Sequence, residues 1–208
     1  TRYGRRFLNQ RSLENQKIPK LDELLELSSK NLSQDTIINL EIKSTPDEKN
    51  LTPNPKEMVQ IVLNDIKKSN LQDKIIISSF DWRILREVKN QSPEISRAYL
   101  TFQQEKGMKI KKTIYSKSPW IDHIPLTIVY DLPKIIKELG GSAWHPYYKD
   151  INKKAVKDAH DYNLPVNVWT VNDEYNMLKM IEYEVDGIMT DYPLKLKELC
   201  DKKNIKWF

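Results

Sequence analysis

The chain has 208 residues, of which 39% are hydrophobic and 30% are charged, and its formal net charge is +5 at pH 7. This length allows one sizeable domain with a proper core. No run of about 18 apolar residues occurs, which excludes a membrane-spanning helix. The lysines are scattered and form no basic stripe among aromatic residues, so we expect no nucleic-acid partner.

The single cysteine, Cys200, excludes an internal disulfide and a cysteine-based zinc site. It lies in an amphipathic pattern near the end of the chain, where we expect a small packed residue. The chain begins at Thr1 without a methionine or an apolar signal core. We therefore expect an upstream segment, and the sequence leaves the cellular location open.

The first third of the chain predicts a helix, a strand and a second helix. Apolar residues at helical spacing predict a short amphipathic helix over 21–27. Residues 36–43 are apolar and β-branched at first and then alternate, which is typical of a strand. A loop with three prolines covers 44–55, and an apolar stripe predicts a helix over 56–69.

The middle of the chain repeats this alternation. The apolar run at 74–79 predicts a strand that is buried on both faces. Asp81 is expected to cap a helix over 82–90, and a shorter strand is expected at 95–100. Residues 102–130 predict an ordered loop or insertion, because they are polar at first and then carry prolines.

The last third predicts three more strands and four more helices. The expected strands are 142–146, 165–171 and 185–190, and the expected helices are 132–139, one capped by Asp150, one that starts at 172–173 and one from Pro193. Strands and helices thus alternate along the whole chain, which indicates a parallel sheet with crossover helices.

Two α/β architectures fit this alternation, a doubly wound sheet and a (β/α)₈ barrel. None of the five glycines falls in the pattern of a phosphate-binding loop after a strand, which weakens the dinucleotide-binding version. A barrel needs eight strands and the sequence predicts six. If the chain is a barrel, it lacks the first two or three strands.

Glu41 and Lys43 are the strongest candidates for a functional site. Side chains two apart on a strand share a face, so both point the same way at the carboxyl end of their strand. A carboxylate beside an ammonium fits a site for a metal and a phosphate, and it equally fits a structural ion pair. In a barrel this end of the strand lies on the rim where active sites are built.

Other polar residues at strand ends have structural explanations. Asn172 and Asp173 are good helix caps, and Trp169 fits a packed core position. Among the three histidines, His145 alone is placed at a strand end, and we expect His160 to be a packed or capping residue. No histidine spacing resembles a zinc site.

Five stretches together resemble the glycerophosphodiester phosphodiesterase family. Residues 18–24 are similar to its I-P-T-L-E-E-V helix start, and 39–43 to its N-I-E-I-K strand. Residues 77–81 are similar to S-S-F-D. The most specific stretches are 168–172 and 185–193, which resemble V-W-T-V-N and V-D-G-I-I-T-D-Y-P. They occur in the family's order over nearly the whole chain.

The resemblance implies a fold and an activity. The fold is a (β/α)₈ barrel of the phospholipase C-like phosphodiesterase type, present in residues 1–208 as one incomplete, N-terminally truncated domain. The activity is metal-dependent hydrolysis of a small glycerophosphodiester to glycerol 3-phosphate and an alcohol, a phosphoric diester hydrolase reaction of lipid metabolism. The cofactor is a divalent cation, Mg²⁺ or Ca²⁺, whose charge neutralises that of the phosphoryl oxygens.

The resemblance also assigns roles to individual residues. Glu41 becomes one metal carboxylate. Lys43 becomes a catalytic and substrate-binding residue that contacts the phosphate or holds the carboxylate in place. Phe80 and Trp169 line the substrate pocket.

The chain departs from the family pattern at its start. The H-R-G, P-E-N-T, E-L-D and H-D motifs are absent, and these carry both catalytic histidines, the arginine and two further metal carboxylates. His123, His145 and His160 match none of these positions. We therefore expect this chain to be inactive without the missing N-terminal segment of the barrel.

A non-catalytic remnant or binding domain of the same fold is the alternative. Because a partial barrel leaves strand edges unpaired, we expect the isolated chain to self-associate or to be poorly soluble. By resemblance to exported relatives, a periplasmic or secreted location is suspected, and a cytoplasmic one stays open.

Overall fold

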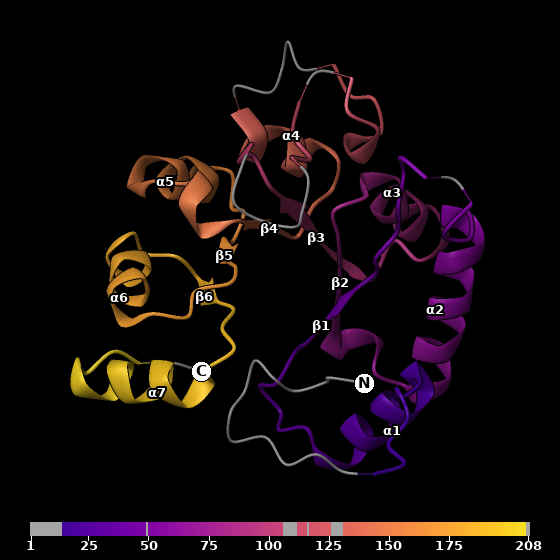
Figure 1. The fold of residues 1–208 in the computed structure, drawn as a ribbon, viewed down its shortest axis with the longest axis horizontal. Coiled ribbons are helices and arrows are strands. Elements are labelled where there is room, and N and C mark those ends of the chain that lie inside the picture. Colours follow the sequence, from indigo (N-terminus) through magenta and orange to yellow (C-terminus); the bar gives the residue numbers. More distant parts are fainter. Residues whose placement is uncertain (1–13, 49, 106–111, 116, 126–130, 207–208) are drawn as a thin grey trace.

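The computed structural model describes residues 14–48, 50–105, 112–115, 117–125 and 131–206. Parallel strands alternate with helices along this part of the chain, as the sequence predicts (Figure 1). The strands are β1 (Ile38–Glu41), β2 (Ile75–Ser79), β3 (Ser96–Thr101), β4 (Ala143–Pro146), β5 (Asn167–Val168) and β6 (Gly187–Ile188).

The helices lie around the outside of the strands (Figure 1). They are α1 (Leu21–Asn31), α2 (Pro55–Ser69), α3 (Trp82–Gln91), α4 (Leu132–Glu138), α5 (Lys153–Asp161), α6 (Glu174–Glu182) and α7 (Pro193–Lys202), with short 3₁₀ turns at η1 (Gln72–Lys74), η2 (Pro119–Ile121) and η4 (Tyr148–Asp150). The predicted cap of α3 is confirmed, since the Asp81 carboxylate accepts from the Arg83 amide. The predicted cap of α5 is wrong: Asp150 lies in η4, and Asn152 caps the helix.

The strands follow one another in chain order across the sheet. β1 to β4 form a continuous parallel ladder, and β5 pairs with β6. Backbone hydrogen bonds link β4 to the β5 region, from Trp144 N to Pro165 O at 2.8 Å and from Trp169 N to Pro146 O at 3.3 Å. This order is that of a barrel and not of a doubly wound sheet, in which the order reverses.

No closed barrel is seen in the described part of the chain. The hydrogen-bonded ladders there end at β1 on one side and at β6 on the other. The side chains of these two regions nevertheless approach each other, because Asn39 Nδ2 lies 3.8 Å from Met189 Sδ.

The last two strands are shorter than the sequence predicts. The Asp186 carboxylate accepts from Val166 N at 2.7 Å, and the amides of Asp186 and Gly187 both donate to Val166 O. The Asp186 side chain thus accepts the hydrogen bond that Val166 N would otherwise donate to a backbone carbonyl of the neighbouring strand. A side chain larger than glycine at position 187 would displace that of Asn167, because an added Cβ would lie 2.4 Å from Asn167 Oδ1.

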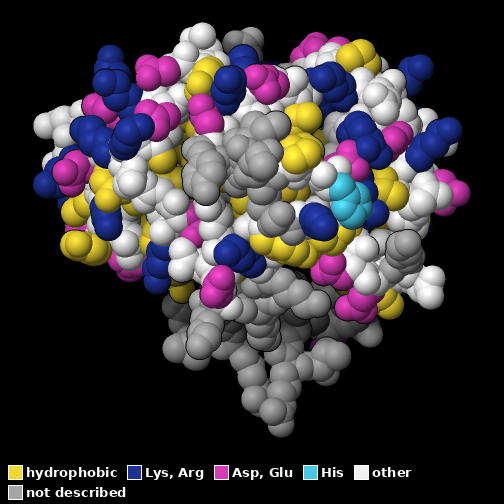
Figure 2. Space-filling view, turned by 90° about the horizontal axis from the view of Figure 1, so that it is seen from above, with side chains coloured by type: hydrophobic (Ala, Val, Ile, Leu, Met, Phe, Trp, Pro, Cys, Tyr) yellow, Lys and Arg dark blue, Asp and Glu magenta, His cyan; other side chains and the backbone are white. Residues whose placement is uncertain are grey.

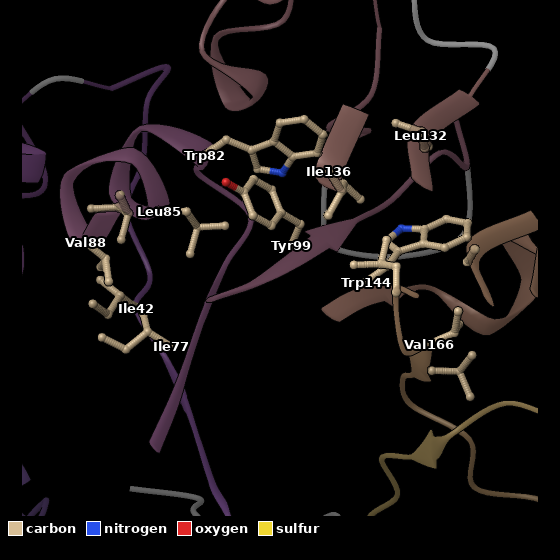
Figure 3. Close-up of a cluster of buried hydrophobic side chains, with 14 of the residues drawn as sticks. Ile42, Ile77, Trp82, Leu85, Val88, Tyr99, Leu132, Ile136, Trp144 and Val166 are labelled. Atoms are coloured by element: carbon tan, nitrogen blue, oxygen red, sulfur yellow. The ribbon is translucent and has the colours of Figure 1, made fainter. Parts of the chain in front are cut away.

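We call the face of the sheet that meets the helices the outer face. Its apolar side chains form the main core, where Ile42 and Ile77 lie beside Leu85 of α3 (Figure 3). Trp82 packs edge-on against Tyr99, with ring centroids 5.0 Å apart. These side chains have almost no exposed surface, so the outer face is where burial stabilises the fold.

We call the opposite face the inner face. The register places Glu41 beside Ser78, and Leu100 beside His145, so these side chains share it. Toward the carboxyl ends of the strands it carries a second hydrophobic cluster, which consists of Leu100, Phe102, Tyr147 and Trp169, with Phe80, Tyr148 and Met189 packed against it. The inner face therefore combines buried polar groups with aromatic rings.

Among the described residues on the face seen in Figure 2, charged side chains of the two signs are mixed. Basic and acidic side chains are interspersed there among exposed apolar ones, in agreement with the scattered lysines of the sequence. Within the described residues, no helix is long and apolar enough to cross a membrane. Cys200 is free and buried, as expected for a small packed residue.

Candidate functional site

Glu41 and Lys43 lie on the same face, as predicted, and form an ion pair. Lys43 Nζ is 2.5 Å from Glu41 Oε1. The Lys43 side chain is 76% exposed, whereas that of Glu41 is 28% exposed. Glu41 Oε1 is itself shielded from solvent and makes no hydrogen bond of normal geometry to a described residue. The carboxylate is therefore fixed mainly by the flexible, solvated ammonium of Lys43.

A pocket of about 330 Å³ opens beside this ion pair. Phe80, at the end of β2, lines it together with Glu41 and Lys43. The structure therefore brings together three of the four residues that the sequence analysis assigns to the site. The volume is at the lower end of the range for small-molecule sites.

Trp169, the fourth predicted residue, lies behind Phe80. Its ring meets Phe80 edge-on, with centroids 5.3 Å apart, and also packs against Tyr147 at 5.2 Å. Its indole Nε1 donates to the backbone carbonyl of His145 over 2.8 Å. Because Trp169 is buried, its visible effect is to hold the Phe80 ring in place.

Asp81 anchors the loop that follows β1. The buried carboxylate accepts a 2.5 Å hydrogen bond from the Ser44 hydroxyl. The guanidinium of Arg83 donates to both of its oxygens, at 2.9 and 2.7 Å. The hydrogen bond to Asp81 raises the pKa of Arg83 above its usual range. Asp81 is thus a structural residue in the wall of the pocket.

Two further pocket residues were missed in the sequence. Asp47, in the loop after β1, and Trp120, in η2, line the same pocket. In the sequence, these two residues stand out only because prolines lie near them in polar stretches. Such prolines indicate ordered loops, but they do not predict which part of the fold the loops contact. The contact between them joins positions 73 residues apart.

In the described part of the chain, no three acidic, histidine or cysteine side chains are grouped to hold a metal ion. Among the described residues at the pocket, Glu41 fits the predicted role, since its carboxylate supplies hard oxygen atoms and contacts the exposed ammonium of Lys43. The neighbouring Asp81 is engaged by Arg83 and Ser44. The described residues thus supply one carboxylate for a divalent cation.

His145 lies within the inner face, below the aromatic cluster. Its Nε2 is 3.0 Å from Asn167 Nδ2, and its Nδ1 has no hydrogen-bond partner among the described residues. Burial lowers the pKa of His145 to about 4. The ring is therefore neutral at pH 7, which does not favour it as a proton-transfer group.

The remaining predicted positions have structural roles. Asn172 Nδ2 donates to Asp191 Oδ2 over 2.8 Å, and the amide of Asp191 donates back to Asn172 Oδ1. Asp173 caps α6, as expected. The prediction for His160 is wrong, because its half-exposed ring lies 2.8 Å from the Asp186 carboxylate.

Comparison with known proteins identifies relatives that are named as glycerophosphodiester phosphodiesterases. A curated glycerophosphodiester phosphodiesterase from Caldanaerobacter subterraneus is 30% identical over 202 residues, which are 97% of this chain and 67% of that protein. The solved structure of a protein from Silicibacter pomeroyi, assigned to the glycerophosphoryl diester phosphodiesterases, superposes with a TM-score of 0.81 at 32% identity, over 100% of this chain and 64% of that one.

A phosphodiesterase from Oleispira antarctica has been solved with its product sn-glycerol 3-phosphate. It is 22% identical, covers 79% of this chain and 55% of its own, and gives a TM-score of 0.57, which shows the common fold. The present chain thus spans about two thirds or less of the length of these relatives. The model of the glycerophosphoryl diester phosphodiesterase family matches residues 3–195, and the chain belongs to this family of phosphoric diester hydrolases.

Proposed function

We propose that this chain is the carboxyl-terminal part of a barrel that hydrolyses glycerophosphodiesters to glycerol 3-phosphate and an alcohol. The observation that carries the proposal is the pairing of Glu41 and Lys43 at a pocket in a chain of this family. The Oleispira relative, with glycerol 3-phosphate bound, supports a small phosphorylated glycerol as the ligand.

The roles follow from the chemistry of the side chains. Glu41 would hold a divalent cation, Mg²⁺ or Ca²⁺, which when bound neutralises charge on the phosphoryl oxygens. The exposed ammonium of Lys43 exchanges its contact with Glu41 for a phosphate oxygen as the diester enters. Phe80 covers the apolar part of the substrate, and Trp169 fixes the position of its ring.

Hydrolysis requires further residues beyond the described ones. A cation of this kind takes six or more oxygen ligands, and the described residues offer the single carboxylate of Glu41. His145 is buried and does not line the pocket, so we look for the proton donor and acceptor elsewhere. We assign both to a barrel segment that pairs with the edges of β1 and β6, which are unpaired within the described residues.

The test compares two proteins in the presence of Mg²⁺ or Ca²⁺. One is the 208-residue chain, and the other is the same chain extended by the residues that its gene encodes before Thr1. Release of glycerol 3-phosphate from glycerophosphocholine and glycerophosphoethanolamine is measured. We expect turnover by the extended protein alone, and we expect a chelator to abolish it.

Two results would contradict the proposal. Turnover by the 208-residue chain alone would show that it carries the whole site. A gene with an in-frame stop directly before Thr1, or an extended protein without turnover, would instead support a non-catalytic binding domain of the same fold.

A further inference from the structure

The backbone on both sides of Lys43 is held by buried side chains. Before Lys43, the Ser79 hydroxyl donates to Ile42 O over 2.8 Å. After Lys43, the Ser44 hydroxyl donates to Asp81 Oδ2 over 2.5 Å. The exposed Lys43 side chain thus extends from a backbone that is fixed on either side.

These contacts are enclosed within the fold. Ser44, Ser79 and Asp81 are all buried, and Ile42 lies in the main core beside Leu85 (Figure 3). Water does not readily replace a lost partner at such a site, so a buried hydrogen bond constrains its groups more than an exposed one does. We call the three buried side chains of Ser44, Ser79 and Asp81 the strand-end network.

The strand-end network also fixes Phe80. The amide of Asp81 donates to Ser79 Oγ over 3.0 Å, which closes a turn around Phe80. Ser79 and Asp81 flank Phe80 in the chain, just as the two residues that they hold flank Lys43. Phe80 and Lys43 line the same pocket, so the network ties two of its lining residues into one unit.

Asp81 is held in place without Ser44. The guanidinium of Arg83 donates to both carboxylate oxygens, and the Arg83 amide donates to Oδ1 over 3.1 Å. Removal of the Ser44 hydroxyl therefore leaves Asp81 paired and the cap of α3 intact. Ser44→Ala is for this reason a milder variant than any change of Asp81.

We infer that Ser44, through its hydrogen bond to Asp81, is a positioning residue for Lys43. The bond fixes the backbone from which the ammonium reaches Glu41 and the Phe80 ring. The inference rests on the proposed function, in which Lys43 contacts the phosphate. A group that is in place before the ligand arrives binds it at a lower entropic cost, and so loss of the bond weakens phosphate binding.

A double-mutant cycle tests this role, because it separates an effect through Lys43 from a direct one. Affinity for glycerol 3-phosphate is measured by calorimetry with the extended protein in the presence of Mg²⁺. We expect Ser44→Ala to weaken binding about fivefold. In the Lys43→Gln background, the same substitution should change the affinity by less than about 1.5-fold.

A measurement without ligand checks the backbone itself. The Ile42 amide donates to Ser78 O over 2.9 Å, and its hydrogen exchange reports opening of this end of β1. In the 208-residue protein, Ser44→Ala should speed this exchange about fivefold. The matched control is Ser69→Ala, which removes a half-buried hydroxyl bonded to Ile66 O on α2 and should leave the exchange and the affinity unchanged.

Three results would overturn the inference. If Ser44→Ala weakens binding equally with and without the Lys43 ammonium, Ser44 contacts the ligand directly or acts on the fold as a whole. Unchanged affinity in Ser44→Ala, or unchanged exchange of the Ile42 amide, would show that the hydrogen bond does not position Lys43. An extended protein that binds no glycerol 3-phosphate would remove the contact on which the inference rests.

The two proposals fail in different ways. A coupled cycle in an extended protein that binds glycerol 3-phosphate but cleaves no diester would overturn the hydrolysis and retain the positioning role. Diester cleavage by Ser44→Ala with the kcat/KM of the unsubstituted extended protein would overturn the positioning role and retain the hydrolysis.

Discussion

The two faces of the sheet bury different kinds of group. On the outer face, Ile77 and Tyr99 are fully covered by the helices and pack against other apolar side chains. On the inner face, Glu41 Oε1 contacts the solvated Lys43 ammonium, and two further buried polar atoms, Ser78 Oγ and His145 Nδ1, have no hydrogen-bond partner among the described residues. Each such atom costs about 1–3 kcal/mol of stability.

The difference separates the part of the sheet that stabilises the fold from the part that is suited to chemistry. The outer face is mainly apolar and closely packed. Its buried Arg97, beside Ile77 in the register, donates to the backbone carbonyls of Pro93, Ile95 and Gly140, and its Nε has no partner among the described residues. The inner face retains polar groups at a cost in stability. This is expected of a surface that meets a cation or a substrate.

The largest effect is expected from Ile77→Ala on the outer face. Ile77 of β2 is fully buried beside α3, and its truncation leaves a cavity in close-packed surroundings. We expect a loss of about 4 kcal/mol in the free energy of unfolding, measured by urea denaturation. A loss below about 1 kcal/mol would show that the outer face is loosely packed.

The second largest effect is a pH dependence of the free energy of unfolding, which arises from His145. Its pKa in the folded chain is about 4, below the ordinary value of 6.5, so the unfolded chain binds a proton that the folded chain excludes. The stability that His145 contributes is thus complete above pH 6.5 and is lost as the pH falls toward 4. Because each tenfold change in proton affinity corresponds to about 1.4 kcal/mol, the loss amounts to about 3 kcal/mol.

His145→Gln is the comparison for this prediction, because the other titrating groups stay the same. Urea denaturation measures how much the free energy of unfolding falls between pH 7 and pH 4. This fall should be about 3 kcal/mol smaller in the variant than in the unsubstituted protein. Equal losses in the two proteins would mean that His145 is solvated or partnered.

A smaller effect of opposite sign is expected from Ser78→Ala, the neighbour of Ile77 on the inner face. The substitution removes a buried hydroxyl without a partner among the described residues and leaves almost no cavity. The free energy of unfolding should rise by about 1 kcal/mol. A fall of that size would instead reveal a partner for the hydroxyl.

The smallest effect on stability is expected from Lys43→Gln. The ammonium is solvated and its ion pair with Glu41 is partly exposed, so the variant should lose no more than about 0.5 kcal/mol. Affinity for glycerol 3-phosphate, in contrast, should fall clearly in a calorimetric titration of the extended protein. Unchanged affinity would limit Lys43 to a structural role.

The sequence was sufficient to predict the order of strands and helices, because apolar runs such as 74–79 and the alternation at 36–43 report burial directly. It was also sufficient for the pairing of Glu41 and Lys43, which depends only on strand geometry. It could not predict the length of β6, since the Asp186 side chain replaces a ladder bond there. Nor could it place Trp120 beside Asp47, because that contact depends on how two distant loops pack.

The central claim is that Glu41 is the carboxylate around which the hydrolytic site is built. The direct measurement is the release of glycerol 3-phosphate from glycerophosphocholine by the extended protein with Mg²⁺ or Ca²⁺. Glu41→Gln should lower kcat/KM by about 100-fold or more, and the control Glu26→Gln, on the exposed side of α1, should leave it unchanged. Activity of Glu41→Gln within about twofold of the unsubstituted protein would contradict the account.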